Sequence, residues 1–222
     1  MADLRQLTLD LGHRAALARE DFLVAPSNQE AVAWIDRWPD WPAPILVVHG
    51  PAGCGKTHLG AVWTRRAGAL GIQLDGDDLR RLGPIPECLV DDAETFGPDA
   101  TFLHFLNRVA ERRGHALVLA QSAPARWQGR LADLMSRLRA APTVAIQPPD
   151  DTLIAAVLVK LFSDRQLLVG AEVINYLVTR MERSFEAARQ VVAMADRSAL
   201  SEGRAVTVPL MREVLAQHTT QD

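Results

Sequence analysis

The sequence has few cysteines, very little lysine and no long apolar stretch. Its two cysteines, Cys54 and Cys88, are too few for a disulfide framework and lack metal-ligand spacing. No apolar run approaches the roughly 20 residues that span a bilayer, and the N-terminus lacks the apolar core of a signal peptide. These absences exclude a disulfide-stapled secreted domain and a membrane span, and they predict a cytoplasmic protein.

An excess of charge of one sign is also missing. The 222 residues carry 24 basic and 27 acidic side chains, so the net charge of −3 gives no general drive toward nucleic acid. Only Lys56 and Lys160 are lysines, and all other basic residues are arginines. A lysine kept among so many arginines indicates a need for the compact ammonium group of Lys56.

The composition that is present, 48% hydrophobic and 23% charged, is typical of a globular protein. Between residues 21 and 149, short apolar runs alternate with segments of helical periodicity. This alternation predicts an α/β layered fold with a parallel sheet of about five strands. The expected strands are 45–48, 72–74, 88–90, 116–120 and 144–146, and the expected helices are 31–38, 57–69, 102–113 and 131–138.

The two ends of the chain differ from this central segment. Residues 1–20 have little to bury and are predicted to be a loosely attached tail. After Pro148 and Pro149 only helical periodicity remains, which predicts a small all-helical unit over 150–222 with the proline pair as its hinge. The helices expected in this unit are 151–162, 171–181, 184–200 and 207–218.

The strongest functional signal is a GxxxxGK[ST] loop directly after the 45–48 strand and at the start of the next helix. Its glycines let backbone N–H groups converge on phosphate oxygens at a helix N-terminus. Lys56 is expected to reach the β- and γ-phosphates and the Thr57 hydroxyl to ligate Mg²⁺. The alternative is a glycine-rich turn that binds nothing. The expected phosphate-binding residues are Gly50, Pro51, Ala52, Gly53, Cys54, Gly55, Lys56, Thr57 and His58.

A second signal is the apolar run 88–90, which ends in Asp91 and Asp92. Asp91 is expected to hold Mg²⁺ through water, and Asp92 to orient or activate an attacking water. The alternative is that the acidic pair caps the next helix. Asp77 and Asp78 form a competing pair, but no apolar strand directly precedes them.

A P-loop sheet domain followed by a helical lid resembles the AAA+ ATPases, and among them the DnaA and Hda families. Residues 20–28, EDFLVAPSN, are similar to the F-x-V-x-x-S-N segment that lies against the adenine in these families. Residues 133–138, DLMSRL, are similar to their S-R-[LF] element, whose arginine reaches the nucleotide of a neighbouring subunit. Residues 204–209 also match the lid in layout. The resemblance implies ADP or ATP with Mg²⁺ as ligands, Arg137 as an arginine finger in trans, and an adenine side formed by Phe22, Leu23, Val24 and Asn28.

Two further features resemble the Hda family in particular. The chain stops at Asp222, before the position of the DNA-binding helix-turn-helix domain of DnaA. Residues 6–11, QLTLDL, are similar to the QL[SD]LxL peptide that binds the sliding clamp, the β subunit of DNA polymerase III. A polar anchor followed by apolar side chains suits a linear motif on a tail, although an amphipathic fragment packed on its own domain is the alternative. The implied clamp-binding residues are Gln6, Leu7, Leu9 and Leu11.

Two positions depart from the family pattern. Ser122 stands where the family usually has aspartate, and with Asp92 it is expected to position water. The lid arginine that senses the γ-phosphate falls near Glu186, whose carboxylate would repel phosphate. Arg183 or Arg189 is left open as a substitute, with a plain surface position as the alternative. The departures predict that the chain holds a nucleotide but hydrolyses it poorly alone.

The resemblance implies a negative regulator of chromosomal replication initiation, associated with the nucleoid and replisome, that docks on the DNA-loaded clamp. There it would stimulate ATP hydrolysis by DnaA and leave inactive ADP–DnaA. Its partners would be DnaA and the clamp, with DNA contacted only through the clamp, no membrane, and a homo-oligomer left open for the unengaged protein. The alternatives are an AAA+ helicase loader or clamp-loader-like factor, a nucleotide-locked scaffold and a P-loop small-molecule kinase.

Overall fold

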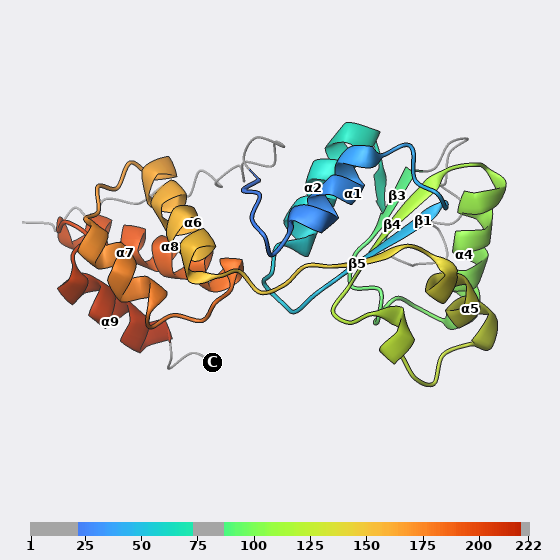
Figure 1. Cartoon of the computed structure of the whole chain (residues 1–222). Coiled ribbons are helices and arrows are strands. Elements are labelled where there is room, and N and C mark those ends of the chain that lie inside the picture. The colour runs from blue at the N-terminus through green and yellow to red at the C-terminus, as the bar shows by residue number, and fades with distance from the viewer. Residues whose placement is uncertain (1–21, 73–86, 219–222) are drawn as a thin grey trace, which may run out of the picture.

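The computed structural model describes residues 22–72 and 87–218, which form two units joined by residues 146–150 (Figure 1). The first unit is a β-sheet flanked by helices, and the second contains helices alone. In the part of the chain that the structure describes, every helix is too short or too polar to span a membrane.

A five-stranded parallel sheet forms the centre of the first unit, with strand order β2-β3-β4-β1-β5. Strand β1 lies between β4 and β5, away from the edges of the sheet. Hydrophobic clusters with helices pack on both of its faces. A strand buried on both faces is continuously apolar, which explains the unbroken run 45–48. The strands are β1 (Ile45–His49), β2 (Leu70–Ile72), β3 (Glu87–Val90), β4 (His115–Ala120) and β5 (Thr143–Ala145).

Two hydrophobic clusters fill the space between the sheet and its helices. Ile45 and Val47 belong to the cluster under α4 and α5, whereas Leu46 and Val48 belong to the cluster under α1 and α2. Successive side chains of a strand point to opposite faces, so one four-residue run supplies both layers. The helices of this unit are α1 (Gln29–Arg37), α2 (Lys56–Ala67), α4 (Asp99–Glu111) and α5 (Ala132–Ala140), with a short 3₁₀ turn η2 (Pro124–Arg126).

The second unit packs four helices around one core that includes Phe162 and Leu177. Side-chain caps fix where two of these helices begin. The Asp150 carboxylate accepts from the Leu153 amide at 2.7 Å, and the Ser184 hydroxyl accepts from the Ala187 amide at 3.1 Å. The helices are α6 (Asp151–Asp164), α7 (Ala171–Val178), α8 (Phe185–Glu202) and α9 (Val208–His218).

The predicted α/β sheet followed by a helical unit is confirmed, with element ends displaced by a few residues. Helix α2 ends at Ala67 because Gly68 adopts a left-handed φ of 63°. Helix α7 ends at Val178, before the expected residue 181, and the Thr179 hydroxyl bonds back to the Asn175 carbonyl at 3.0 Å. Strand β2 covers 70–72, and the rest of the run expected at 72–74 lies outside the described residues.

Candidate nucleotide-binding site

The GxxxxGK[ST] loop joins β1 to the first turn of α2, as the sequence predicts. Gly53 and Gly55 have φ values of 69° and 100°, which glycine adopts without steric cost. A Cβ on Gly50 would lie 2.3 Å from the Ile146 carbonyl oxygen, so a side chain there is excluded by backbone. The loop therefore has the shape that turns backbone N–H groups toward an anion at the start of α2.

Lys56 is held by the loop itself. Its Nζ donates to the carbonyl oxygens of Gly50 at 2.7 Å and Pro51 at 2.8 Å, and lies 3.8 Å from Cys54 Sγ. Burial raises the pKa of the Cys54 thiol, while the charge of Lys56 lowers it by less. A buried thiol kept protonated is a poor nucleophile, which agrees with a packing role for Cys54.

The two residues expected to hold Mg²⁺ lie together. Thr57 Oγ1 donates to Asp91 Oδ2 at 3.0 Å, which links the first turn of α2 to the end of β3. Among the described residues no cluster of three or more His, Cys, Asp or Glu side chains can hold a metal. A hydroxyl and one carboxylate nevertheless fit Mg²⁺, because this ion keeps several waters and takes further oxygens from substrate phosphates.

The acidic pair at the end of β3 forms a turn and does not cap a helix. Asp92 has a φ of 54° and its carboxylate accepts from the Thr95 hydroxyl at 3.2 Å. The next helix, α4, has Pro98 at its N-cap position and no side-chain cap. The helix-cap alternative for these acids is therefore wrong, and both side chains are exposed at the carboxyl edge of the sheet.

Glu94 is a site residue that the sequence analysis missed. Its carboxylate accepts from the backbone amides of Gln121 and Ser122, each at 2.8 Å, and from the Ser122 hydroxyl at 3.2 Å. Glu94 thus ties the loop after β3, which carries Asp91 and Asp92, to the loop after β4. The local signal for it in the sequence is a third acid shortly after the pair.

The segment expected on the adenine side lies next to the start of α2. The Asn28 side chain is buried, accepts from the Ala25 amide at 2.9 Å and donates to the Leu23 carbonyl at 2.9 Å. The Phe22 ring meets the His58 ring edge-on, with centroids 5.3 Å apart. Val24 is 53% exposed, so its side chain is open to contact. The structure therefore brings this segment to the P-loop and fixes its backbone through Asn28.

The helical unit contacts the P-loop through the first residues of α8. The Phe185 amide donates to the Gly53 carbonyl at 2.9 Å. The Phe185 ring lies 3.0 Å from where a Cβ on Gly55 would be, and Ser184 Cβ lies 2.5 Å from a Cβ on Gly53. Glycine at these two positions thus also lets the lid approach.

The two lid arginines near Glu186 are both in ion pairs. Arg189 contacts Glu186 at 2.7 Å, and its hydrogen bond lowers the pKa of that carboxyl. Arg183 contacts Asp151 at 2.7 Å. The Glu186 carboxylate is therefore partly neutralised within its own helix, and either arginine must leave its partner before it can meet a phosphate.

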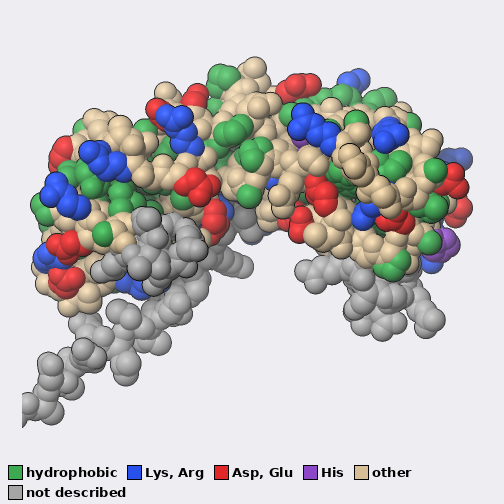
Figure 2. Space-filling model, turned by 90° about the horizontal axis from the view of Figure 1, so that it is seen from below, with side chains coloured by type: hydrophobic (Ala, Val, Ile, Leu, Met, Phe, Trp, Pro, Cys, Tyr) green, Lys and Arg blue, Asp and Glu red, His purple; other side chains and the backbone are tan. Residues whose placement is uncertain are grey.

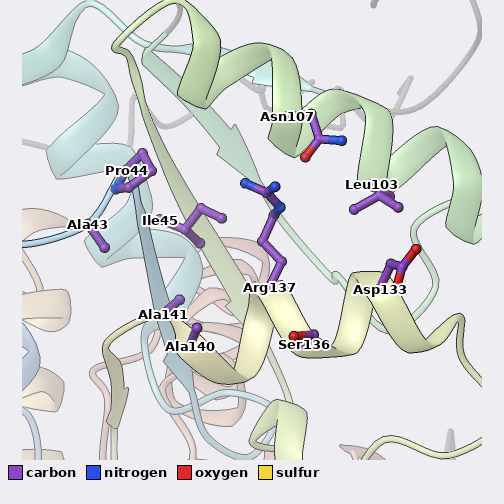
Figure 3. A pocket seen from close by; sticks show the side chains of 10 residues that line it. All are labelled: Ala43, Pro44, Ile45, Leu103, Asn107, Asp133, Ser136, Arg137, Ala140 and Ala141. Carbon is purple, nitrogen blue, oxygen red and sulfur yellow. The ribbon is translucent and has the colours of Figure 1, made fainter.

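Arg137 lies far from the P-loop. It is exposed on α5 and borders a groove that also includes Pro44 and Ile45, at the amino end of β1 (Figure 3). The P-loop follows the other end of β1, and five residues of strand rise by about 16 Å. Arg137 has no ion pair within the described ranges, and its place beside the amino end of β1 separates it from the nucleotide site of its own chain by the length of that strand. The predicted clamp-binding residues Gln6, Leu7, Leu9 and Leu11 lie outside the described residues.

Known proteins resemble this chain in two ways. Residues 151–215 match the family model of the Hda lid domain. Domain III of DnaA from Thermotoga maritima superposes with a TM-score of 0.76 at 16% identity, covering 90% of this chain and 96% of that one. DnaA from Aquifex aeolicus bound to AMPPCP has a TM-score of 0.65 at 18% identity, covering 83% of this chain and 67% of that one.

A variant of RuvB from Thermotoga maritima has a TM-score of 0.69 at 10% identity, covering 90% of this chain and 71% of that one. The chain spans about two thirds of the length of a DnaA bound to AMPPCP and single-stranded DNA, with 65% of that chain covered. At these low identities the structural matches establish the fold alone. The lid match adds a feature specific to one family. The chain thus has the fold of DnaA domain III, with a parallel sheet unit followed by a helical unit that matches the Hda lid domain over residues 151–215.

Proposed function

We propose that this chain is a negative regulator of DNA replication initiation that stimulates the hydrolysis of ATP bound to DnaA. The observation that carries the proposal is the Hda lid match over residues 151–215, behind a sheet unit with the DnaA fold. The position of Arg137, exposed and remote from its own P-loop, supports a role on the nucleotide of a partner.

The proposed chemistry takes place in the partner's site. Water attacks the γ-phosphorus of the partner's ATP, the bond to the β–γ bridging oxygen breaks, and ADP and phosphate are the products. Negative charge spreads over the transferring group in the transition state, where a guanidinium supplied in trans can contribute about 10³ to 10⁵ in rate. Arg137 supplies this guanidinium, so its effect appears in hydrolysis by DnaA and not in hydrolysis by this chain.

The chain's own site binds ADP or ATP in this proposal. Lys56 exchanges the carbonyls of Gly50 and Pro51 for phosphate oxygens, and Thr57 and Asp91 hold Mg²⁺, which neutralises phosphate charge when bound. The adenine lies against the segment 22–28. We expect slow hydrolysis by the chain itself, because Ser122 replaces the usual aspartate with a much weaker base and its hydroxyl proton is already donated to Glu94.

We further propose that residues 6–11 dock on the β sliding clamp, so that DNA is met only through the clamp. Tethering on DNA raises the effective concentration of the chain near DNA-bound DnaA. Figure 2 shows basic and acidic side chains interspersed on the face in view, without a continuous basic patch on that face. This pattern agrees with indirect contact to DNA, and we propose that the chain acts in the cytoplasm at the nucleoid.

The test is single-turnover hydrolysis of ATP prebound to DnaA, in the presence of DNA-loaded clamp. Four proteins are compared: the intact chain, Arg137→Ala, a deletion of residues 1–20, and Arg139→Ala. Arg139 is a second exposed arginine of α5 and therefore a matched control for the loss of one surface charge. We expect the intact chain and Arg139→Ala to accelerate hydrolysis, and the other two to lose the effect.

Other results would favour the alternatives. Tight nucleotide binding with no effect of the intact chain on DnaA would reject the regulator and favour an AAA+ loader or a scaffold. Phosphate transfer to a small molecule without any protein partner would favour a P-loop kinase.

A further inference from the structure

A groove of about 550 Å³ separates α4 from α5 beside the amino end of β1 (Figure 3). Its apolar wall includes Pro44, Ile45 and Leu103, and its polar residues include Asn107 of α4 and Arg137 of α5. Leu103 and Asn107 are four residues apart on one helix and therefore lie on the same face of α4. The residue proposed as the finger thus shares a groove with an amide side chain of the neighbouring helix.

Asn107 carries an unsatisfied hydrogen-bond acceptor. Its Oδ1 is buried and has no hydrogen-bond partner, although the residue as a whole is only half-buried. A buried acceptor without a donor is costly, and most buried polar atoms in proteins are paired.

Arg137 has the complementary property. Its guanidinium carries five N–H donors and no acceptor, and it forms no hydrogen bond or ion pair within residues 22–72 and 87–218. Figure 3 shows the guanidinium pointing toward Asn107, with the amide oxygen of Asn107 on the side that faces it. Asp133, the acid one turn earlier on α5, points away from Arg137 in the same view. The donor without an acceptor therefore faces the acceptor without a donor.

We propose that Asn107 is a positioning residue for Arg137, whose amide oxygen holds the guanidinium against α4 while no partner is engaged. The structure has this hydrogen bond open, so the proposal requires a change in the outer torsions of the arginine side chain that closes it. Engagement of a partner's nucleotide must break it, so the contact keeps the finger in a withheld position. The functional consequence rests on the proposed trans action of Arg137, whereas the contact itself does not.

Withholding Arg137 raises the half-saturating concentration of the protein and leaves the maximal rate unchanged. When only a fraction of molecules has a free Arg137, the apparent dissociation constant for the partner rises by the inverse of that fraction. Once the complex is saturated, the hydrogen bond is already broken in every molecule. The proposal therefore predicts an effect on the half-saturating concentration and none on the maximal rate, whereas loss of a merely structural residue would lower the maximal rate or the melting temperature.

Two substitutions at position 107 act in opposite directions. Asn107→Leu removes the acceptor and keeps the volume, so about three- to tenfold less protein should give half-maximal stimulation of DnaA. Asn107→Asp supplies a charged acceptor, so about tenfold more protein should be needed. His104→Asp places the same charge on an exposed position of α4 outside the groove and should match the unmodified protein. A lower maximal rate for Asn107→Leu at unchanged half-saturation would overturn the proposal.

A second measurement is independent of DnaA. Nitrogen NMR relaxation of the Arg137 Nε–Hε group in the isolated chain reports whether the guanidinium is held. It should be restricted in the unmodified protein, more restricted in Asn107→Asp, and mobile in Asn107→Leu or, where the leucine variant fails to fold, in Asn107→Ala. Equal mobility in all forms would overturn the proposal. If mobility follows the series while no form stimulates DnaA, the proposed function fails and the holding contact stands.

Discussion

The Thr57 hydroxyl and the Asp91 carboxylate lie 3.0 Å apart although 34 residues separate them in the chain. Helix α2 starts directly after β1, and Asp91 directly follows β3, two strands away in the sheet order. A parallel sheet brings the carboxyl ends of all its strands to one edge, so a hydroxyl from one loop and a carboxylate from another meet there. These two oxygen ligands suit a Mg²⁺ ion that keeps several of its water ligands.

Asp91→Asn tests the metal role. The change keeps the shape of the side chain and removes its charge, so Mg²⁺ should strengthen ATP binding about tenfold less than in the unmodified protein. Isothermal titration calorimetry with and without Mg²⁺ measures the difference. Asp40→Asn, at an exposed position outside the P-loop, is the control. An unchanged response to Mg²⁺ in Asp91→Asn would remove Asp91 from the metal site.

Gly55→Ala tests the shape of the phosphate loop. Its φ of 100° strains any residue with a Cβ, and that Cβ would lie only 3.0 Å from the Phe185 ring, so we expect a loss of about 1–3 kcal/mol in the free energy of unfolding and loss of nucleotide binding. Gly68→Ala is the matched control, because Gly68 is also left-handed but has no atom within 4 Å of an added Cβ.

The control separates backbone strain from the site itself. Gly68→Ala should lose about 1 kcal/mol from its conformation alone and still bind a fluorescent nucleotide normally. Thermal unfolding and nucleotide titration measure the two effects. Normal nucleotide binding by Gly55→Ala would show that the loop does not need its left-handed turn.

Glu94→Gln tests the link between the loops after β3 and β4. The Glu94 carboxylate accepts hydrogen bonds from three donors. A glutamine side chain has one acceptor oxygen in place of two, so one donor would face its NH₂ group. We expect a loss of about 1–3 kcal/mol in stability and faster hydrogen exchange at the Gln121 and Ser122 amides. Glu30→Gln, on the exposed side of α1, should leave both amides as they are. Unchanged exchange in Glu94→Gln would mean that the loop is held by other contacts.

Alkaline pH should destabilise the fold through Cys88. Burial raises the pKa of this thiol from 9.0 to about 12, so the folded state keeps the proton after the unfolded state has lost it. The stabilisation is therefore complete below pH 9.0 and is lost as the pH rises from there toward 12. Burial also raises the pKa of Cys54, which adds to the loss in the same direction, and otherwise only two lysines and one tyrosine of the chain titrate near this range.

Urea unfolding at a series of pH values from 8 upward measures this loss. Cys88→Ala removes the titrating group and should flatten the pH dependence, although it costs some stability at every pH because a core side chain is shortened. The same slope in both proteins would assign the alkaline loss to other groups.

The phosphate loop, the sheet and the helical unit were predictable because each depends on local signals. Strand 45–48 is apolar on both faces, and glycines stand where the backbone needs them at residues 50, 53 and 55. The contact of Phe185 with the P-loop was not predictable, because it joins segments 130 residues apart that share no pattern. The role of Glu94 was not predictable for a related reason. Two of its hydrogen-bond donors are backbone amides of another loop, and the sequence does not indicate which backbone groups come together.

Glu186 shows what the structure adds to a residue that the sequence already singles out. The sequence locates a carboxylate where a family arginine is expected, but only the structure adds that Arg189, one turn along the same helix, pairs with it. The i,i+3 spacing of Glu186 and Arg189 on one helix is a local signal for such a pair. Arg183, in the loop before α8, pairs with Asp151 at the start of α6, 32 residues away, and no spacing rule indicates that contact.

The placement of the P-loop and Arg137 at opposite ends of β1 gives the molecule a direction. A contact that joins the Arg137 end of one molecule to the P-loop end of another uses two different surfaces, so repeated copies form either a closed ring or an open row. An open row built through this contact would have one end with an unused arginine and another with an uncovered nucleotide. If Arg137 acts in trans as proposed, a partner that lacks one of these surfaces would end the row, and the order of subunits would decide which nucleotide is hydrolysed.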